Sequence, residues 1–141
     1  MPLDEAKKKI LLAEDDVDDR DFFADFLGDR TDIRLLPGLT TGVEVIEYLN
    51  GVSLSELLPD VIILDQNMPK LTGLETLSYI RSNERFSRIH VVIYSTYVGQ
   101  ELVDECLKRG GSLVKSKPVS KDGYNMMMDE ILAVCKSVPV G

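Results

Sequence analysis

The sequence predicts an α/β protein built on a doubly wound parallel sheet, and three observations carry this prediction. Strand-like and helix-like segments alternate five times along the 141 residues, which is typical of βαβ units. The apolar runs are short and largely β-branched, as in strands that are buried on both faces. Most runs end in polar or charged residues, at the edge where open α/β sheets place their chemistry.

The first half of the chain supplies two strands and two helices. A strand is expected at 10–13, where four apolar residues follow one another, and a second at 33–36, where only Arg34 interrupts the apolar residues. A helix is expected at 17–27, because Phe22, Phe23 and Phe26 recur at helical spacing before Gly28. The same spacing of Val45 and Leu49 predicts a second helix at 41–49.

The central strand lies in the segment PDVIILDQNMP, from Pro59 to Pro69. Its apolar run ends on the carboxylate of Asp65, and Pro69 cannot donate to a sheet, so the strand cannot continue through it. Asp65 is therefore expected at the carboxyl end of a central strand. Taken alone, Asp65 could equally be a residue that starts a turn.

The second half continues the alternation. Helices are expected at 71–81 and 98–109, and a last helix runs from the N-cap Ser120 to about Lys136. Strands are expected at 91–94 and 113–116. We expect a single domain over residues 1–141, with its core from Lys9 to Lys136 and loose termini, including 138–141.

Composition excludes several classes of protein. The formal net charge of -8 disfavours direct nucleic-acid binding and favours binding of a cation. No signal peptide and no membrane-spanning run is found, so a cytoplasmic protein without membrane insertion is expected. Cys106 and Cys135 are too far apart for a zinc motif and are expected to be packing thiols.

Some polar and flexible residues are expected to be structural. The acids of the first helix could suggest an EF-hand, but the required glycine and final glutamate are absent, so a solvated helix face is preferred; these acids are Asp16, Asp18, Asp19 and Asp21. His90 is expected to be exposed and without function. Met126, Met127 and Met128 are adjacent, so core packing with one exposed methionine is expected.

Polar and charged residues follow four of the predicted strands. They form the pairs Glu14 and Asp15, Asp65 and Asn67, Ser95 and Thr96, and Lys117 and Pro118. Because parallel strands end at one edge, three carboxylates should converge there and repel one another. A hard cation such as Mg²⁺, which prefers oxygen ligands, would relieve this repulsion. A carboxylate in such a setting can accept a phosphoryl group as an aspartyl-phosphate.

The motifs ILLAEDD, VIILDQNMP, VVIYST and KSKP resemble, in order and spacing, the receiver domain of bacterial two-component response regulators. The resemblance runs from about Lys9 to Lys136 and implies the flavodoxin-like (βα)5 fold with strand order 2-1-3-4-5, which is the arrangement described for the chemotaxis-regulator-like family. It implies that Asp65 is the phosphoacceptor, that Ser95 and Lys117 assist, and that Mg²⁺ is held by Glu14, Asp15, Asp65 and the backbone carbonyl of Asn67. Pro118 stands where the family commonly has a cis peptide.

One position departs from the family pattern. Three residues before Lys117 the family usually has an aromatic residue that moves on phosphorylation, and here that place holds Val114. The usual hydroxyl–aromatic switch is therefore in doubt, and Tyr94 and Tyr97 are the nearest aromatic residues. We expect the ring of Tyr97, helped by Thr96, to restrict water access, so that the aspartyl-phosphate lasts minutes instead of seconds.

The function expected from this resemblance is a stand-alone receiver and not an enzyme with an external substrate. A sensor histidine kinase or a histidine phosphotransfer protein would donate the phosphoryl group, and a further protein, or a second copy in a homodimer, would take up the signal. The alternative is a degenerate receiver that acts as a phosphorylation-independent interaction domain. A flavin module is disfavoured because Glu14 and Asp15 would repel FMN phosphate, and an Asp-based phosphatase is disfavoured because Asn67 cannot transfer protons.

Overall fold

The computed structural model describes residues 7–137 and shows one five-stranded parallel sheet in the order β2-β1-β3-β4-β5. The central strands are β1 (Lys8–Ala13), β3 (Val61–Asp65) and β4 (His90–Ser95), and the edge strands are β2 (Ile33–Leu35) and β5 (Leu113–Ser116). The predicted doubly wound fold and its strand order are confirmed. The tail expected at 138–141 lies outside the described residues.

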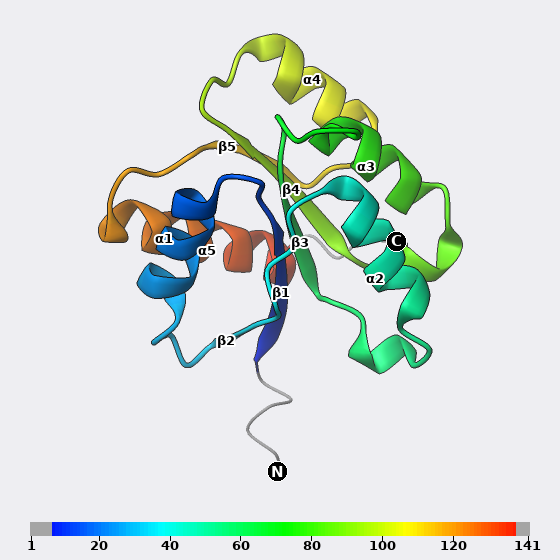
Figure 1. Ribbon diagram of the computed structural model, residues 1–141, viewed down its shortest axis with the longest axis horizontal. Coiled ribbons are helices and arrows are strands. Elements are labelled where there is room, and N and C mark those ends of the chain that lie inside the picture. Colours follow the sequence, from blue (N-terminus) through cyan, green and yellow to red (C-terminus); the bar gives the residue numbers. More distant parts are fainter. Residues whose placement is uncertain (1–6, 138–141) are drawn as a thin grey trace.

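Helices cover both faces of this sheet (Figure 1). One face carries α1 (Val17–Leu27) and α5 (Lys121–Ser137), and the other carries α2 (Gly42–Gly51), α3 (Gly73–Arg81) and α4 (Gln100–Lys108). Two short 3₁₀ turns, η2 (Ser55–Leu57) and η3 (Glu84–Phe86), precede β3 and β4. No helix within residues 7–137 is both long and apolar enough to cross a membrane.

The alternation of side chains along β3 explains why its sequence is apolar throughout. Ile62 and Leu64 point into the core beneath α2, α3 and α4, whereas Val61 and Ile63 point into the core beneath α1 and α5. Both faces of the strand are fully buried, so no polar position is tolerated until the strand ends at Asp65.

Several predicted boundaries and exposures are refined. The helix expected from residue 71 begins at Gly73, because Thr72 and Glu75 form a capping box. The helix expected from residue 98 begins at Gln100, after the N-cap Gly99. The expectation that His90 is exposed is wrong: it is a buried residue of β4, and its ring nitrogen Nδ1 lies 3.0 Å from Ser112 Oγ.

The expected packing of the thiols and methionines is confirmed. Cys106 is a buried free thiol, and Cys135 is a half-buried free thiol. All three methionines belong to α5: Met127 and Met128 are buried against the sheet, while Met126 is exposed.

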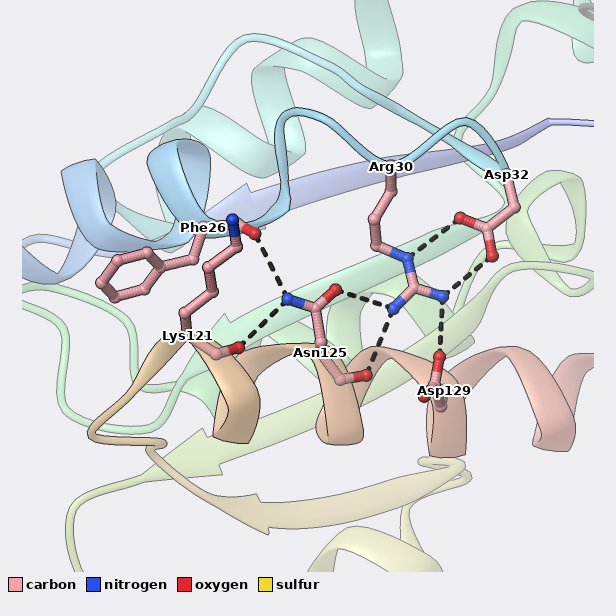
Figure 2. A network of polar contacts seen from close by, with 6 residues as sticks. All are labelled: Phe26, Arg30, Asp32, Lys121, Asn125 and Asp129. Atoms are coloured by element: carbon pink, nitrogen blue, oxygen red, sulfur yellow. Dashed lines mark hydrogen bonds and ion pairs between the residues drawn. The ribbon is translucent and has the colours of Figure 1, made fainter.

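Arg30, in the turn between α1 and β2, ties that turn to α5 (Figure 2). Its guanidinium donates to both carboxylate oxygens of Asp32, at 3.0 and 2.8 Å, and to Asp129 Oδ1 at 2.7 Å. It also donates to the side-chain and backbone oxygens of Asn125, at 3.0 and 3.2 Å. Asn125 in turn donates to the carbonyl of Phe26 at 3.4 Å, so α1, the turn and α5 form one hydrogen-bonded unit.

Arg81, at the end of α3, makes comparable bonds on the opposite face of the sheet. It donates to the carbonyls of Gly110 at 2.9 Å and Ile89 at 2.7 Å. Gly110 has φ +92, a left-handed conformation that favours glycine and ends α4. Arg109 adds a bond from its guanidinium to Ser78 Oγ at 3.3 Å, so the carboxyl end of α4 is fixed to α3.

Candidate functional site

The site lies at the carboxyl edge of the sheet, where β1, β3, β4 and the loop after β5 meet. Glu14, Asp65 and Ser95 are buried there, and Asp65 is only 2% exposed. Asp15 is exposed next to them, and the side chain of Lys117 is 14% exposed. The structure thus brings together the acidic residues and the lysine that the sequence placed at different strand ends.

The loop after β1 is shaped by the immediate start of α1. Asp16 caps this helix by accepting the backbone N–H of Asp19 at 3.0 Å. The backbone N–H of Asp16 donates to Glu14 Oε2 at 3.1 Å, and Arg20 donates to the Glu14 carbonyl at 2.8 Å. Glu14 is therefore held by its own loop as well as by its burial.

The loop after β3 is shaped by the close approach of α3. Asp65 Oδ1 accepts the backbone N–H of Asn67 at 3.2 Å. Gly73 donates its N–H to the Gln66 carbonyl at 3.1 Å, and a Cβ at this glycine would lie 2.9 Å from the carbonyl oxygen of Asp65. Only glycine allows α3 to begin so close to the backbone of the site.

Lys117 is the cation shared by three carboxylates. Its Nζ lies 3.0 Å from Glu14 Oε1, 3.1 Å from Asp19 Oδ2 and 3.4 Å from Asp65 Oδ2. Asp19 belongs to the acidic run of α1 that was expected to be a solvated helix face; it is partly exposed, but its ion pair with Lys117 was not expected. Its partner is 98 positions away in the sequence, so no local pattern indicates the pair.

Burial and charge shift the protonation of the central groups. Burial, followed by the hydrogen bond and charge of Glu14, raises the pKa of Asp65 to about 7, against the lowering effects of the Asn67 N–H and Lys117. Burial acts to lower the pKa of Lys117, but the carboxylates of Glu14, Asp19 and Asp65 outweigh it and raise that pKa. Lys117 therefore stays positively charged while Asp65 titrates near neutrality in the absence of a metal.

Tyr94 is a residue of the site that the sequence motifs did not indicate. It lies on β4 opposite Asp65, and its hydroxyl donates to Glu14 Oε1 at 2.5 Å. Its ring faces Lys117, with Nζ 5.2 Å from the ring centroid. A tyrosine in an otherwise apolar strand is the signal that could have found it, because a buried phenol needs a partner.

The three carboxylates fit a divalent cation. Oxygen atoms of Glu14, Asp15 and Asp65 all lie within 4.8 Å of one another. Carboxylate oxygens are the donors that Mg²⁺ and Mn²⁺ prefer, and Asp15 opens the group to solvent, where a cation with several waters could enter. Asn67, the fourth predicted ligand, is exposed beside them.

A cleft of about 460 Å³ adjoins the site on the side of α4. It is lined by Asn67, Ser95 and Tyr97, together with residues of α3 and α4, but not by Asp65. Tyr97 lines this cleft, and it is 79% exposed. Thr96 is also exposed.

The position of the missing aromatic is filled by an aliphatic residue. Val114 is half-buried on β5 and packs against the core beneath α4. Tyr94 lies in the opposite core, beneath α1 and α5, and Tyr97 is on the surface, so neither takes its place. Pro118 follows Lys117 through a trans peptide, since residues 7–137 contain no cis bond; the cis peptide common in the family is absent here.

This fold, with acids and a lysine converging at one sheet edge, defines a signal receiver. A sequence profile of the response regulator receiver domain matches residues 10–128, and the chain belongs to this family. The nitrate/nitrite response regulator NarL of Escherichia coli K12 is 41% identical over 86 residues, which are 59% of this chain and 39% of NarL. The two-component response regulator ARR3 of Arabidopsis thaliana is 30% identical over 124 residues, covering 84% of this chain and 53% of ARR3. The chain thus spans only about two fifths to half of these relatives.

Solved structures resemble it over nearly their whole length. The phosphorylated cyanobacterial phytochrome response regulator RcpA has a TM-score of 0.77 at 26% identity, covering 94% of this chain and 96% of RcpA. The Mn²⁺-bound response regulator Rcp1 has a TM-score of 0.76 at 28% identity, covering 95% of this chain and 99% of Rcp1.

Proposed function

We propose that this receiver accepts a phosphoryl group on Asp65 from a histidine kinase or a histidine phosphotransfer protein, in the presence of Mg²⁺. The observation that carries the proposal is the position of Asp65: it is buried at the end of β3, with Lys117 Nζ 3.4 Å from one oxygen and the Asn67 N–H on the other. Such a carboxylate has a charged donor ready for phosphoryl oxygens. Phosphorylated RcpA, which has the same fold, supports the proposal.

In the proposed step, an Asp65 oxygen forms a bond to phosphorus while the bond from phosphorus to the donor histidine nitrogen breaks. The bonding pair stays on the imidazole nitrogen, which takes up a proton from water. Lys117 then pairs with a phosphoryl oxygen, and Ser95, at the end of the neighbouring strand, supplies a hydroxyl on the side of the cleft. The chain's own residues orient the acceptor and stabilise charge, and no external substrate is turned over.

The metal is proposed to be held by Glu14, Asp15, Asp65 and Asn67. Their oxygen donors suit Mg²⁺, and the Mn²⁺-bound state of Rcp1 supports a cation at this edge. When bound, the cation neutralises negative charge on phosphoryl oxygens. A stand-alone role, in which signalling occurs through contacts with another protein or a second copy, is part of the proposal and rests on the resemblance to the response regulators RcpA and Rcp1. A cytoplasmic location remains a prediction of the sequence.

The test is covalent modification by a small phosphoryl donor. Incubation with phosphoramidate or acetyl phosphate and Mg²⁺ is expected to add one phosphoryl group, mapped to Asp65 by mass spectrometry. Asp65→Asn should abolish the adduct, and omission of Mg²⁺ should suppress it in the wild-type protein. Equal modification of the Asp65→Asn variant would refute the assignment, and no modification at all would favour the phosphorylation-independent interaction domain.

A further inference from the structure

Asp19 is a fourth carboxylate at the site, and it comes from a helix instead of a strand end. Its Oδ2 lies 3.1 Å from Lys117 Nζ, and its backbone N–H is bound to Asp16, which fixes it in the first turn of α1. The Asp19 side chain is 32% exposed, compared with 3% for the Asp65 side chain. Asp19 therefore holds Lys117 from a more solvated position than the buried acids.

The distances show that Lys117 lies closer to two other acids than to Asp65. Its Nζ is closer to Glu14, at 3.0 Å, and to Asp19, at 3.1 Å, than to Asp65, at 3.4 Å. An ammonium has three N–H donors, and the carboxylates of Glu14 and Asp19 take two of them. One N–H remains for Asp65, so a phosphoryl oxygen there would share the charge of Lys117 with Glu14 and Asp19 and compete with them for its position.

We propose that Asp19 is a positioning residue that retains Lys117 in the unphosphorylated protein. This inference rests on the proposed phosphorylation of Asp65. The carboxylate of Asp19 has two effects: it competes for Lys117, and it adds negative charge to the site. Both effects favour binding of a cation to Glu14, Asp15 and Asp65, and both oppose the accumulation of a phosphoryl group there.

Mg²⁺ and a phosphoryl mimic should respond in opposite directions to loss of the Asp19 carboxylate. In Asp19→Asn, Lys117 is free to pair with the buried acids, so Mg²⁺ should bind about fivefold more weakly. The same variant, at saturating Mg²⁺, should bind the phosphoryl mimic beryllofluoride about fivefold more tightly. A residue that only supported the structure would weaken both.

Asp18 provides a matched control. It also lies in the first turn of α1, carries the same charge and is exposed, but no ion pair joins it to Lys117. Asp18→Asn therefore reproduces the change in net charge and in the interaction with the helix dipole. It should change both affinities less than twofold, whereas Asp19→Glu, which keeps the carboxylate, should restore values close to wild type.

The experiment consists of two titrations of the full chain, and amide chemical shifts report binding in each. Mg²⁺ is titrated first, and beryllofluoride is then titrated at saturating Mg²⁺. Melting curves check that each variant is folded, and Asp19→Ser, with the same expected result, replaces Asp19→Asn if that variant does not fold.

Opposite shifts of the two affinities in Asp19→Asn, absent from Asp18→Asn, support the inference. If Asp19→Asn follows Asp18→Asn, or weakens both ligands together, the inference is overturned while the proposed function stands. If the wild-type protein binds Mg²⁺ but not beryllofluoride, both fail.

Discussion

The two helices that pack beside β5, α4 on one face and α5 on the other, are held in very different ways. α5 buries Tyr124, Met127, Met128 and Ile131, and Arg30 binds it to the turn after α1 (Figure 2). α4 buries only Cys106 completely, and its N-cap Gly99 offers no side chain to the first turn.

The difference follows the chemistry of the site. The charged groups, Glu14, Asp19 and Lys117, lie on the side of α1 and α5, where the helices are firmly held. The cleft beside Ser95 and Tyr97 lies on the side of α4, where the helix start is weakly held. The packing of α1 and α5 can therefore hold the charged groups in fixed positions, while the start of α4 can rearrange at a lower cost in free energy.

The largest expected effect comes from truncating one aliphatic side chain in each helix. Ile131→Ala in α5 should lower the free energy of unfolding by about 2–4 kcal/mol, since Ile131 is fully packed beneath the sheet. Leu102→Ala in α4 should cost about 1 kcal/mol, because Leu102 is only partly buried beside the cleft. Urea unfolding of both variants measures the difference, and equal losses would contradict the comparison.

The pH dependence of the free energy of unfolding should arise from the charged groups of the site, and chiefly from Asp65. Without metal, the folded protein holds the Asp65 proton up to about pH 7, whereas the unfolded chain loses it near the ordinary value of 3.8. The free energy of unfolding should therefore fall as the pH rises between these values, and the loss is complete above about pH 7.

Asp65→Asn removes this titration. In buffer containing a chelator, the variant should be more stable than wild type by about 2 kcal/mol at pH 8, with a smaller difference at pH 4.5. Saturating Mg²⁺ should stabilise the wild type and reduce the gap at pH 8. Thermal melts at the two pH values, with and without Mg²⁺, make the measurement; a gap that is larger at pH 4.5 would contradict the assigned shift.

The smallest expected effect comes from the network of Figure 2. Arg30→Ala should lower the free energy of unfolding by about 1 kcal/mol, because Arg30 is mostly buried but Asp32 and Asp129 are solvated. Hydrogen exchange should quicken at the amides of α5 and not at those of α4. Arg30→Lys keeps the charge but loses the forked donor, so an intermediate loss is expected. If hydrogen exchange in α5 is unchanged in Arg30→Ala, Arg30 is not the reason why α5 is held more firmly than α4.

Local sequence signals were sufficient for the sheet and for much of the site. The unbroken apolar run before Asp65 predicted a strand buried on both faces, because any polar residue within it would lack a partner. The shared direction of parallel strands then brought Glu14, Asp65 and Lys117 to one edge. The capping-box spacing of Thr72 and Glu75 is a local signal that marks the start of α3, which the prediction without it put two residues too early.

Residues that depend on distant partners were not predictable in this way. Asp19 looked like part of a solvated helix face until the fold placed Lys117 beside it. Tyr94 finds its partner 80 positions away, and His90 is buried against Ser112, 22 positions away. In each case the side chain's role is decided by tertiary contact and not by its neighbours in the sequence.

The bonds that Arg81 makes have a geometric consequence for α4. The carboxyl end of α4 is fixed through Gly110 and Arg109, while the amino end of α4, at Gly99, lacks a side-chain cap. A helix fastened at one end behaves as a lever, and nine residues at about 1.5 Å each give an arm of roughly 13 Å. A tilt of about 10° would move the tip near Tyr97 by roughly 2 Å and leave the pivot at Gly110 in place. In such a tilt Gln100 would move the most and Lys108 the least.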